Sequence, residues 1–530
     1  MRLRRPGGLD LVFAAAIVVE LAALATLRHV PTVDGPAHLA GARVLSEPGA
    51  ALYRLYYRID LFPSPNMLPT LVLAALVRLT TPTVADTLLH AGYVVLFPLG
   101  LRYAVIGVRR EARWPAFLAF PLSFGYLFWY GFENYCYGVA LALFTIGYAL
   151  RRRHGWGARS AGGLAALFVL TYLSHLVPFA LAALFVAVLA VADARAARPG
   201  VRRRAVLAAP GLALVPATAL IVAFALRGGP TQGPAFGNPL RLLAGLLTLA
   251  IPTVSFSAVE LVFAVLTALV LYVGGIRVVR RMGRRSLSGP AGALAAAAAA
   301  AAVVYMVSPQ QFGLAYGLLH ERISVFPVLF AALWLAAFPA GRRESALGAG
   351  VLLVAAAGLA VTRAPDVRRY ERQMTEYASA AEVVAPGSTM VGLRLQLDTP
   401  RGGPVRQKMF DPLRHATSLV AAETAGVDVG HYEAEYSYFP TAFRPAADLR
   451  RRIDPDLTGL EQVPPRVTLP APQASGHDRI DYVLVWGARQ ATPAVRDSPL
   501  TAALLARLDE SYRLVATTAP EGLVDVYVHR

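Results

Sequence analysis

The sequence predicts a mainly α-helical, polytopic membrane protein that ends in an α/β domain outside the membrane. Of its 530 residues, 56% are hydrophobic and only 16% are charged, and the mean hydropathy is +0.49. Apolar runs of the ~20 residues that cross a bilayer recur as far as residue 362. From residue 363 onward the composition becomes that of a water-soluble domain.

About eleven of these apolar runs are predicted to span the membrane. The run over residues 162–192 is too long for one span, so it is divided at His175 and Pro178. The shorter runs 66–81 and 240–252 could be half-spans, interfacial helices or short full spans, and counting both gives thirteen. The eleven runs lie near residues 9–28, 86–107, 115–131, 133–150, 161–175, 176–193, 206–226, 254–276, 291–308, 323–340 and 346–362.

Arginine placement predicts the orientation of the spans. Residues 1–362 hold 31 arginines and 12 acidic residues, whereas residues 363–530 hold 20 basic and 21 acidic residues. With a cytoplasmic N-terminus, 23 of the 31 arginines fall in the cytoplasmic loops, as the positive-inside rule requires. We therefore expect an inner-membrane protein whose residues 363–530 are extracytoplasmic. No basic–aromatic stripe accompanies the charge, so a nucleic-acid partner is not expected.

Two domains follow from this division. Residues 1–362 form the membrane bundle, with a first outer loop over 29–85, and residues 363–530 form the outer α/β domain. In this domain, helices are predicted over 366–384 and 498–511, with long loops over 396–475. Strands are predicted over 389–395, 480–486, 512–518 and 523–528, the last two forming a hairpin around Ala519-Pro-Glu-Gly522.

Rare polar residues gather at the predicted outer ends of the spans. Ionisable groups at membrane depth are costly and usually serve function, so this clustering suggests a site at the outer face. The simpler interpretation is that such residues only meet water there. The residues concerned are Asp34, His38, Glu47, Asp60, Asp86, His90, Glu133, Asn134, His175, Glu260, His320, Glu321 and Arg322.

The most informative segment, residues 30–43, directly follows the first span. Asp34-Gly35-Pro36 is a turn that leads into a helix with proline among its first positions. His38 follows Asp34 by four residues, about one helical turn, so both side chains can face a common cavity. In the alternative interpretation, Asp34 only caps the helix by accepting backbone N–H bonds.

This arrangement resembles the GT-C superfamily of polytopic glycosyltransferases, which use polyprenyl-phosphate-linked sugars. The resemblance covers the first span, the outer loop with Asp34 and His38, the many spans and the outer C-terminal domain. Many members carry a paired acidic motif at this point, where this sequence has Asp-Gly-Pro. The resemblance implies a hexosyl or pentosyl transferase of the cell envelope, with the lipid bilayer, a polyprenyl-phosphate sugar donor and a glycan, lipid or protein acceptor as partners.

Sugar transfer from a lipid phosphate assigns roles to the polar residues. It needs a base for the acceptor hydroxyl, for which Asp34 is the candidate with His38 beside it. It also needs positive charge or a metal at the departing phosphate, and Asp34 and His38 could hold a divalent ion. The candidates for binding the donor phosphate are His175, His320, Arg322 and Arg43, and those for sugar or acceptor contact are Glu133, Asn134 and Glu321.

Several of these residues also have ordinary structural explanations. His175 could cap a helix, Glu321 and Arg322 could pair with each other, and the aromatic residues around Glu133 suit an interfacial belt. Walker-type, zinc-helix and serine-nucleophile motifs are absent from the sequence. A transporter or flippase of a lipid-linked or small polar substrate, or a non-catalytic envelope scaffold, stays open as an alternative.

Overall fold

The computed structural model describes residues 7–153, 155–196, 202–228, 232–313, 317–396, 411–473 and 478–530. The chain divides into two compact units. The first unit comprises Met1–Leu24, Pro63–Leu68 and His90–Ala364, and the second comprises Ala25–Phe62, Pro69–Leu89 and Pro365–Arg530. The predicted first outer loop therefore contributes most of its residues to the same unit as the C-terminal part of the chain.

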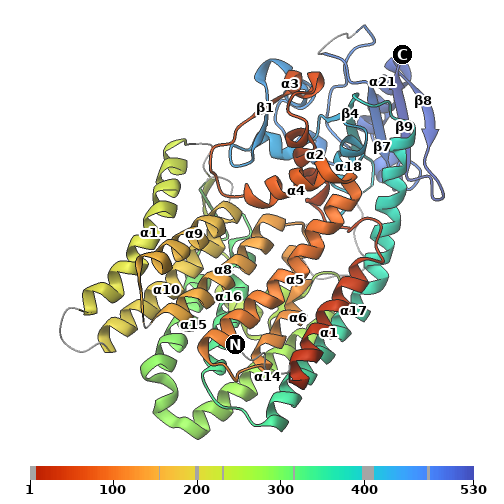
Figure 1. Cartoon of the computed structure of the whole chain (residues 1–530). Coiled ribbons are helices and arrows are strands. Elements are labelled where there is room, and N and C mark those ends of the chain that lie inside the picture. The colour runs from red at the N-terminus through yellow and green to blue at the C-terminus, as the bar shows by residue number, and fades with distance from the viewer. Residues whose placement is uncertain are drawn as a thin grey trace. The chain divides into compact units, whose positions relative to one another are not determined.

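The first unit is a bundle of helices (Figure 1). Among the described residues, seven helices are long and apolar enough to cross a membrane, namely α5, α10, α11, α14, α15, α16 and α17. This confirms a polytopic bundle, and the count of eleven spans stays a prediction. The helices are α1 (Gly8–Leu24), α5 (Pro82–Val108), α8 (Glu133–Arg152), α9 (Ala158–Ser174), α10 (Leu176–Ala196), α11 (Arg202–Leu226), α14 (Glu260–Met282), α15 (Gly289–Val307), α16 (Leu319–Ala336) and α17 (Arg342–Ala378).

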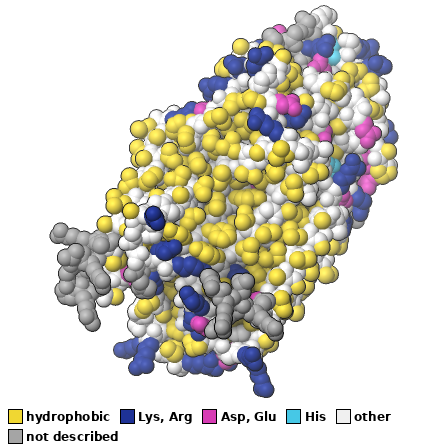
Figure 2. Space-filling model, viewed as in Figure 1, with side chains coloured by type: hydrophobic (Ala, Val, Ile, Leu, Met, Phe, Trp, Pro, Cys, Tyr) yellow, Lys and Arg dark blue, Asp and Glu magenta, His cyan; other side chains and the backbone are white. Residues whose placement is uncertain are grey.

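Hydrophobic side chains cover much of the surface of these helices (Figure 2). Basic side chains lie beyond the margins of this apolar surface (Figure 2). On α14, Arg277 and Arg281 pair with Glu344 of α17. Such an apolar girdle with arginines at its margin is the surface that a bilayer-spanning bundle presents.

The apolar run 115–131 does not form the continuous helix that we predicted. It contains three short helices, η1 (Trp114–Leu118), α6 (Ala119–Ser123) and α7 (Tyr126–Trp129). The chain leaves helical geometry at Phe124 and Gly125, and a Cβ atom at Gly125 would lie 2.3 Å from the carbonyl oxygen of Pro252. Close approach by the backbone of a neighbouring short helix over residues 250–253 thus explains the break, which composition alone does not reveal.

Other boundaries also differ from the prediction. The short runs 66–81 and 240–252 form α4 (Leu68–Leu79) and the pair α12 (Pro239–Leu247) and α13 (Ala250–Thr253), none of which is as long as a full span. Helix α17 continues well beyond residue 362 and includes most of the helix predicted over 366–384.

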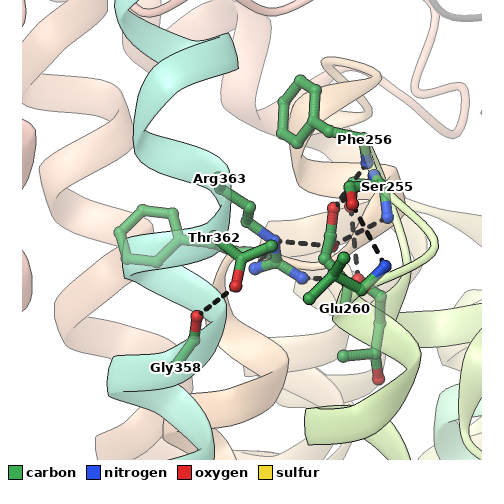
Figure 3. A network of polar contacts seen from close by, with 10 residues as sticks. Ser255, Phe256, Glu260, Gly358, Thr362 and Arg363 are labelled. Carbon is green, nitrogen blue, oxygen red and sulfur yellow. Dashed lines mark hydrogen bonds and ion pairs between the residues drawn. The ribbon is translucent and has the colours of Figure 1, made fainter. Parts of the chain in front are cut away.

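A buried ion pair ties the broken region to α14 and α17 (Figure 3). The Glu260 carboxylate accepts hydrogen bonds from the backbone N–H groups of Ser255, Phe256 and Ser257, and from Nε of Arg363 at 2.8 Å. The same guanidinium also donates to the carbonyl groups of Phe124 and Thr253. The loop before α14 is thereby fixed to the end of the Phe124 turn.

The second unit contains a five-stranded sheet in the order β5-β4-β7-β9-β8. Strand β4 is parallel to β5 and β7, whereas β7–β9 and β9–β8 are antiparallel. The predicted strands and closing hairpin are confirmed as β4 (Thr389–Arg394), β7 (Tyr482–Trp486), β8 (Tyr512–Thr517) and β9 (Val524–His529), and the helix over 498–511 as α21 (Pro499–Ser511).

The predicted long loops over 396–475 are more structured than expected. The described part forms α18 (Ala416–Glu423), β5 (Val427–Asp428), the 3-10 turn η5 (Tyr432–Glu435), β6 (Thr441–Phe443) and α19 (Leu449–Ile453). Residues 397–410, 474 and 475 of this range lie outside the described residues. Strand β6 pairs with β1 (Tyr57–Ile59), and α18 packs against α2 (Gly35–Ser46). This part of the C-terminal region therefore packs against the segment 29–85 that was predicted as the first outer loop.

Candidate functional site

Asp34 occupies the N-cap position of α2 but does not use its side chain as a cap. Its backbone carbonyl accepts from the N–H groups of Ala37 and His38, both at 3.0 Å. The carboxylate instead forms a hydrogen bond with the Tyr432 hydroxyl and lies 3.7 Å from Nε2 of His415. Only 7% of Asp34 is exposed. The carboxylate is therefore directed to residues of the tail.

His38, one turn later, faces a buried carboxylate from the same part of the tail. Its Nδ1 pairs with Glu433, and Glu433 Oε2 lies 3.8 Å from Nε2 of His431. His431 Nε2 is also 3.1 Å from the carbonyl oxygen of Ala37. Gly41 permits this close approach, since a Cβ atom there would lie 3.1 Å from Glu433. Asp34 and His38 thus meet the adjacent residues Tyr432 and Glu433.

The two acids of this cluster are shifted in opposite directions. Burial raises the pKa of Asp34 to about 6, and attraction by His38 and Arg414 opposes this only in part. Burial would also raise the pKa of Glu433, but the charges and hydrogen bonds of His38 and His431 outweigh it and lower that pKa to about 2. Glu433 consequently stays ionised, whereas Asp34 can exchange a proton near neutral pH.

His415 links the Asp34 cluster to a small basic pocket. Burial and the charges of nearby arginines, above all Arg414, lower the pKa of His415 well below its usual range. The pocket has a volume of about 40 Å³ and is lined by His415 together with Arg394, Arg414 and Arg450. Its guanidinium groups have partners, because Arg394 pairs with Asp411, Arg414 pairs with Glu461, and Arg450 donates to two backbone carbonyls.

A second group of polar residues lies at the start of α8. Nε2 of His90, on α5, is 3.4 Å from Oε1 of Glu133, and Asp86 precedes His90 by one helical turn. The ligand atoms of Asp86, His90 and Glu133 lie within 4.8 Å of one another, so these residues could hold a metal ion. Asp34 and His38 do not belong to such a group among the described residues. Asn134 is buried beside Glu133.

The predicted donor-binding residues are only partly brought together. Tyr135 joins two of them, because its ring meets that of His175 edge-on at 5.5 Å and its hydroxyl donates to the backbone oxygen of Arg322 at 2.7 Å. The Arg322 guanidinium lies over the Phe132 ring, 4.6 Å from its centroid. His175 also accepts from the N–H of Val177, so it caps α10, as the structural interpretation of this residue predicts.

The remaining candidates have distinct surroundings. His320 Nε2 lies 2.7 Å from the carbonyl oxygen of Ser308, and its ring contacts Tyr305. Glu321 lines a small pocket of about 30 Å³ together with Tyr135. Arg43, in the second unit, pairs with Glu47 at 3.0 Å on the same helix.

Tyr432, Glu433, His431 and His415 were not identified from the sequence. They come from the stretch predicted to be loops, where no periodicity distinguishes them. The available signal was the density of histidine, acidic and aromatic residues over 431–439, which is unusual for a solvated connection.

No protein-family model and no curated protein matches the sequence. The structure is similar to the crystal structure of ArnT from Cupriavidus metallidurans bound to undecaprenyl phosphate, with a TM-score of 0.51. The similarity covers 98% of this chain and 97% of that chain, at 14% sequence identity. The chain has an ArnT-like fold. This confirms the architecture that the resemblance to the GT-C superfamily implied, over nearly the whole length of both chains.

Proposed function

We propose that the chain is an integral membrane glycosyltransferase that moves a sugar from a polyprenyl-phosphate donor to an acceptor hydroxyl at the outer face of the membrane. The fold supports this, since it is similar to that of ArnT, whose crystal structure holds undecaprenyl phosphate. The observation that carries the proposal is the Asp34 carboxylate, which is buried, is not used as a cap and has a pKa of about 6.

In this reaction Asp34 acts as the general base. Its carboxylate takes the proton of the acceptor hydroxyl while that oxygen forms a bond to the anomeric carbon of the sugar. The bond between the anomeric carbon and the phosphate oxygen breaks, and its electron pair leaves with the polyprenyl phosphate. The Tyr432 hydroxyl and His415 hold the Asp34 carboxylate in place. The ion pair of Glu433 with His38, one helical turn from Asp34, provides a preorganised electrostatic environment for the base.

The donor phosphate needs positive charge, which we assign to Arg322 with His175 beside it. His320 and Arg43 are further candidates for the phosphate, and Glu133, Asn134 and Glu321 for contacts with the sugar or the acceptor. Asp86, His90 and Glu133 would hold a divalent ion if one is used, and such an ion would supply further positive charge for the departing phosphate.

The proposed orientation places the N-terminus in the cytoplasm and the second unit outside. Its test is labelling of intact cells with a membrane-impermeant maleimide. A cysteine replacing the exposed Ser437 should react from outside, whereas one replacing the exposed Ser288 should react only after lysis. The native Cys136 is buried and serves as the background control. The opposite pattern would place Asp34 in the cytoplasm and remove the proposed reaction.

The activity itself is tested by incubating the purified protein with a panel of polyprenyl-phosphate sugars and scoring release of the lipid phosphate. Release that requires an acceptor and is lost in Asp34→Asn supports the transferase. Asp60→Asn, in the same outer segment, is the matched control and should retain activity. Donor binding without release in any acceptor mixture would instead favour the transporter or flippase.

A further inference from the structure

Next to the Asp34 carboxylate, a row of tyrosine rings leads toward the surface of the second unit. The Tyr432 ring packs on His415 with 4.6 Å between ring centroids, and it meets Tyr436 edge-on at 6.2 Å. Tyr436 in turn stacks on Tyr438 at 5.3 Å with an interplanar angle of 21°. All three tyrosines are half-buried, and Ser437 between the last two is exposed.

The rings are held rigidly by their backbone and by neighbouring residues. Tyr432 lies in η5, the Tyr436 N–H donates to the carbonyl of Glu433, and the Phe439 N–H donates to that of Tyr436. Phe439 packs behind Tyr438 at 4.8 Å. Rigid tyrosines provide a large contact area at a low cost in side-chain entropy, which is the composition of many recognition surfaces.

The chemistry of these tyrosine side chains indicates which class of ligand would bind to them. A carbohydrate has ring faces of C–H groups, which pack on aromatic rings, and hydroxyl groups, which need hydrogen-bond partners at the edges. The faces of the tyrosine rings supply the first kind of contact, and their phenol hydroxyl groups supply the second. Glu433 pairs with His38, and Glu435 lies 3.6 Å from Arg451, so residues 432–439 present no excess charge and suit a neutral ligand better than an anionic lipid surface.

We propose that Tyr432, Tyr436 and Tyr438 form a saccharide-binding platform that presents an acceptor glycan to Asp34. This rests on the proposed function and narrows the acceptor from a glycan, lipid or protein to a carbohydrate. The sugar hydroxyl at the Tyr432 end would reach the carboxylate, because Tyr432 itself contacts Asp34. The remainder of the glycan would then extend over Tyr436 and Tyr438.

The test is calorimetric titration of the full chain in nanodiscs with a panel of neutral oligosaccharides. We expect one or more members to bind, and Tyr436→Ala and Tyr438→Ala each to weaken binding ~2- to 10-fold, as loss of an aromatic contact does. Tyr436→Phe keeps the ring but loses one phenol hydroxyl, so it should weaken binding less than Tyr436→Ala does. Tyr527→Ala removes a half-buried tyrosine of the same unit from β9 and should leave binding unchanged.

Steady-state kinetics give a second measurement. The two alanine variants should raise the KM for the acceptor by the same factor while kcat stays close to that of the parent, because the rings bind the ground state and transition state alike. Equal saccharide affinity in the parent and both alanine variants, or no binding at all, would overturn the proposal.

The two proposals can fail separately. Saccharide binding that depends on Tyr436, without release of polyprenyl phosphate from any donor, would refute the transferase and keep the platform. Release of polyprenyl phosphate with an acceptor KM unaffected by both substitutions would refute the platform and keep the transferase.

Discussion

Two buried carboxylates, one in each unit, show the difference between a structural acid and a reactive one. Glu260, in the first unit, has no exposed side-chain surface and accepts three backbone hydrogen bonds in addition to its pair with Arg363. Asp34, in the second unit, is nearly as buried, but its partners are the Tyr432 hydroxyl and His415 at 3.7 Å. The N–H groups and Arg363 around Glu260 stabilise its negative charge. The partners of Asp34 offset the cost of burying its negative charge only in part.

This difference follows from where each acid lies in its helix. Glu260 is the first residue of α14, so its carboxylate can turn back onto the N–H groups that precede the helix. Asp34 has the corresponding opportunity at the N-cap of α2, where an aspartate commonly caps, but its side chain turns toward η5 instead. The Asp34 side chain therefore forgoes a local hydrogen bond to the helix N-terminus, and its carboxylate remains available for the proposed role as general base.

The largest effect is expected from Asp34→Asn. Asparagine has a similar shape but cannot accept the proton, and loss of a general base costs ~10²–10⁴-fold in rate. The substitution also removes a carboxylate that burial destabilises, so the melting temperature at neutral pH should equal or exceed that of the parent. The measurements are release of polyprenyl phosphate and thermal unfolding, with Asp60→Asn as control.

An active Asp34→Asn variant, within a few-fold of the parent, would contradict the assignment of the base. A variant that loses both activity and melting temperature would instead show that Asp34 is as structural as Glu260.

Breaking the Glu260–Arg363 pair should lower the stability of the protein, which Asp34→Asn is expected to leave unchanged or to raise. Arg363→Met leaves Glu260 buried without its counter-charge, and removal of one partner of such a pair costs about 3–5 kcal/mol. Thermal unfolding in detergent should show a large drop in melting temperature. Glu344→Gln, which disrupts an exposed pair with Arg277 and Arg281, should leave the melting temperature close to that of the parent. Similar melting temperatures for the two variants would contradict this interpretation of Glu260.

Arg322 and Arg363 extend the comparison to guanidinium groups of the first unit. Arg363 has its hydrogen bonds directed to Glu260 and two carbonyls, whereas Arg322 lies over the Phe132 ring. If Arg322 contacts the donor phosphate, Arg322→Ala should weaken donor binding by ~10- to 150-fold, which is the value of one charge-assisted contact. Arg322→Lys keeps the charge and should lose less. Unchanged donor affinity in a folded Arg322→Ala variant would leave this arginine with a packing role.

The sequence predicted the features that arise from local pattern or from composition. Seven of the span-length apolar runs, the buried strand predicted over 480–486 and the hairpin around Pro520 are such features, and the structure confirms them. It also identified Asp34 and His38 as neighbours, because four residues make about one turn. It could not predict Tyr432 and Glu433, since nearly 400 residues separate them from Asp34 and their segment has no periodicity. The break at Gly125 was missed for the same reason, because its cause is the distant Pro252.

The smallest expected effect is a pH dependence that distinguishes Asp34 from Glu433. The pKa of Asp34 is about 6, so the carboxylate needed as base is lost below that pH, and the rate should fall about tenfold for each further pH unit. Glu433, with a pKa of about 2, stays ionised throughout this range.

The contribution of Asp34 to the free energy of unfolding changes with pH in the opposite direction to the rate. Its folded-state pKa lies above the unfolded value of 3.8, so its protonated form favours the fold, and this contribution is lost as the pH rises from about 4 to about 6. The parent should therefore gain melting temperature relative to Asp34→Asn when the pH is lowered from about 7.5 to about 5, while its activity falls. A rate that stays constant across this range, or a melting temperature difference that does not change with pH, would show that Asp34 is ionised like any exposed aspartate.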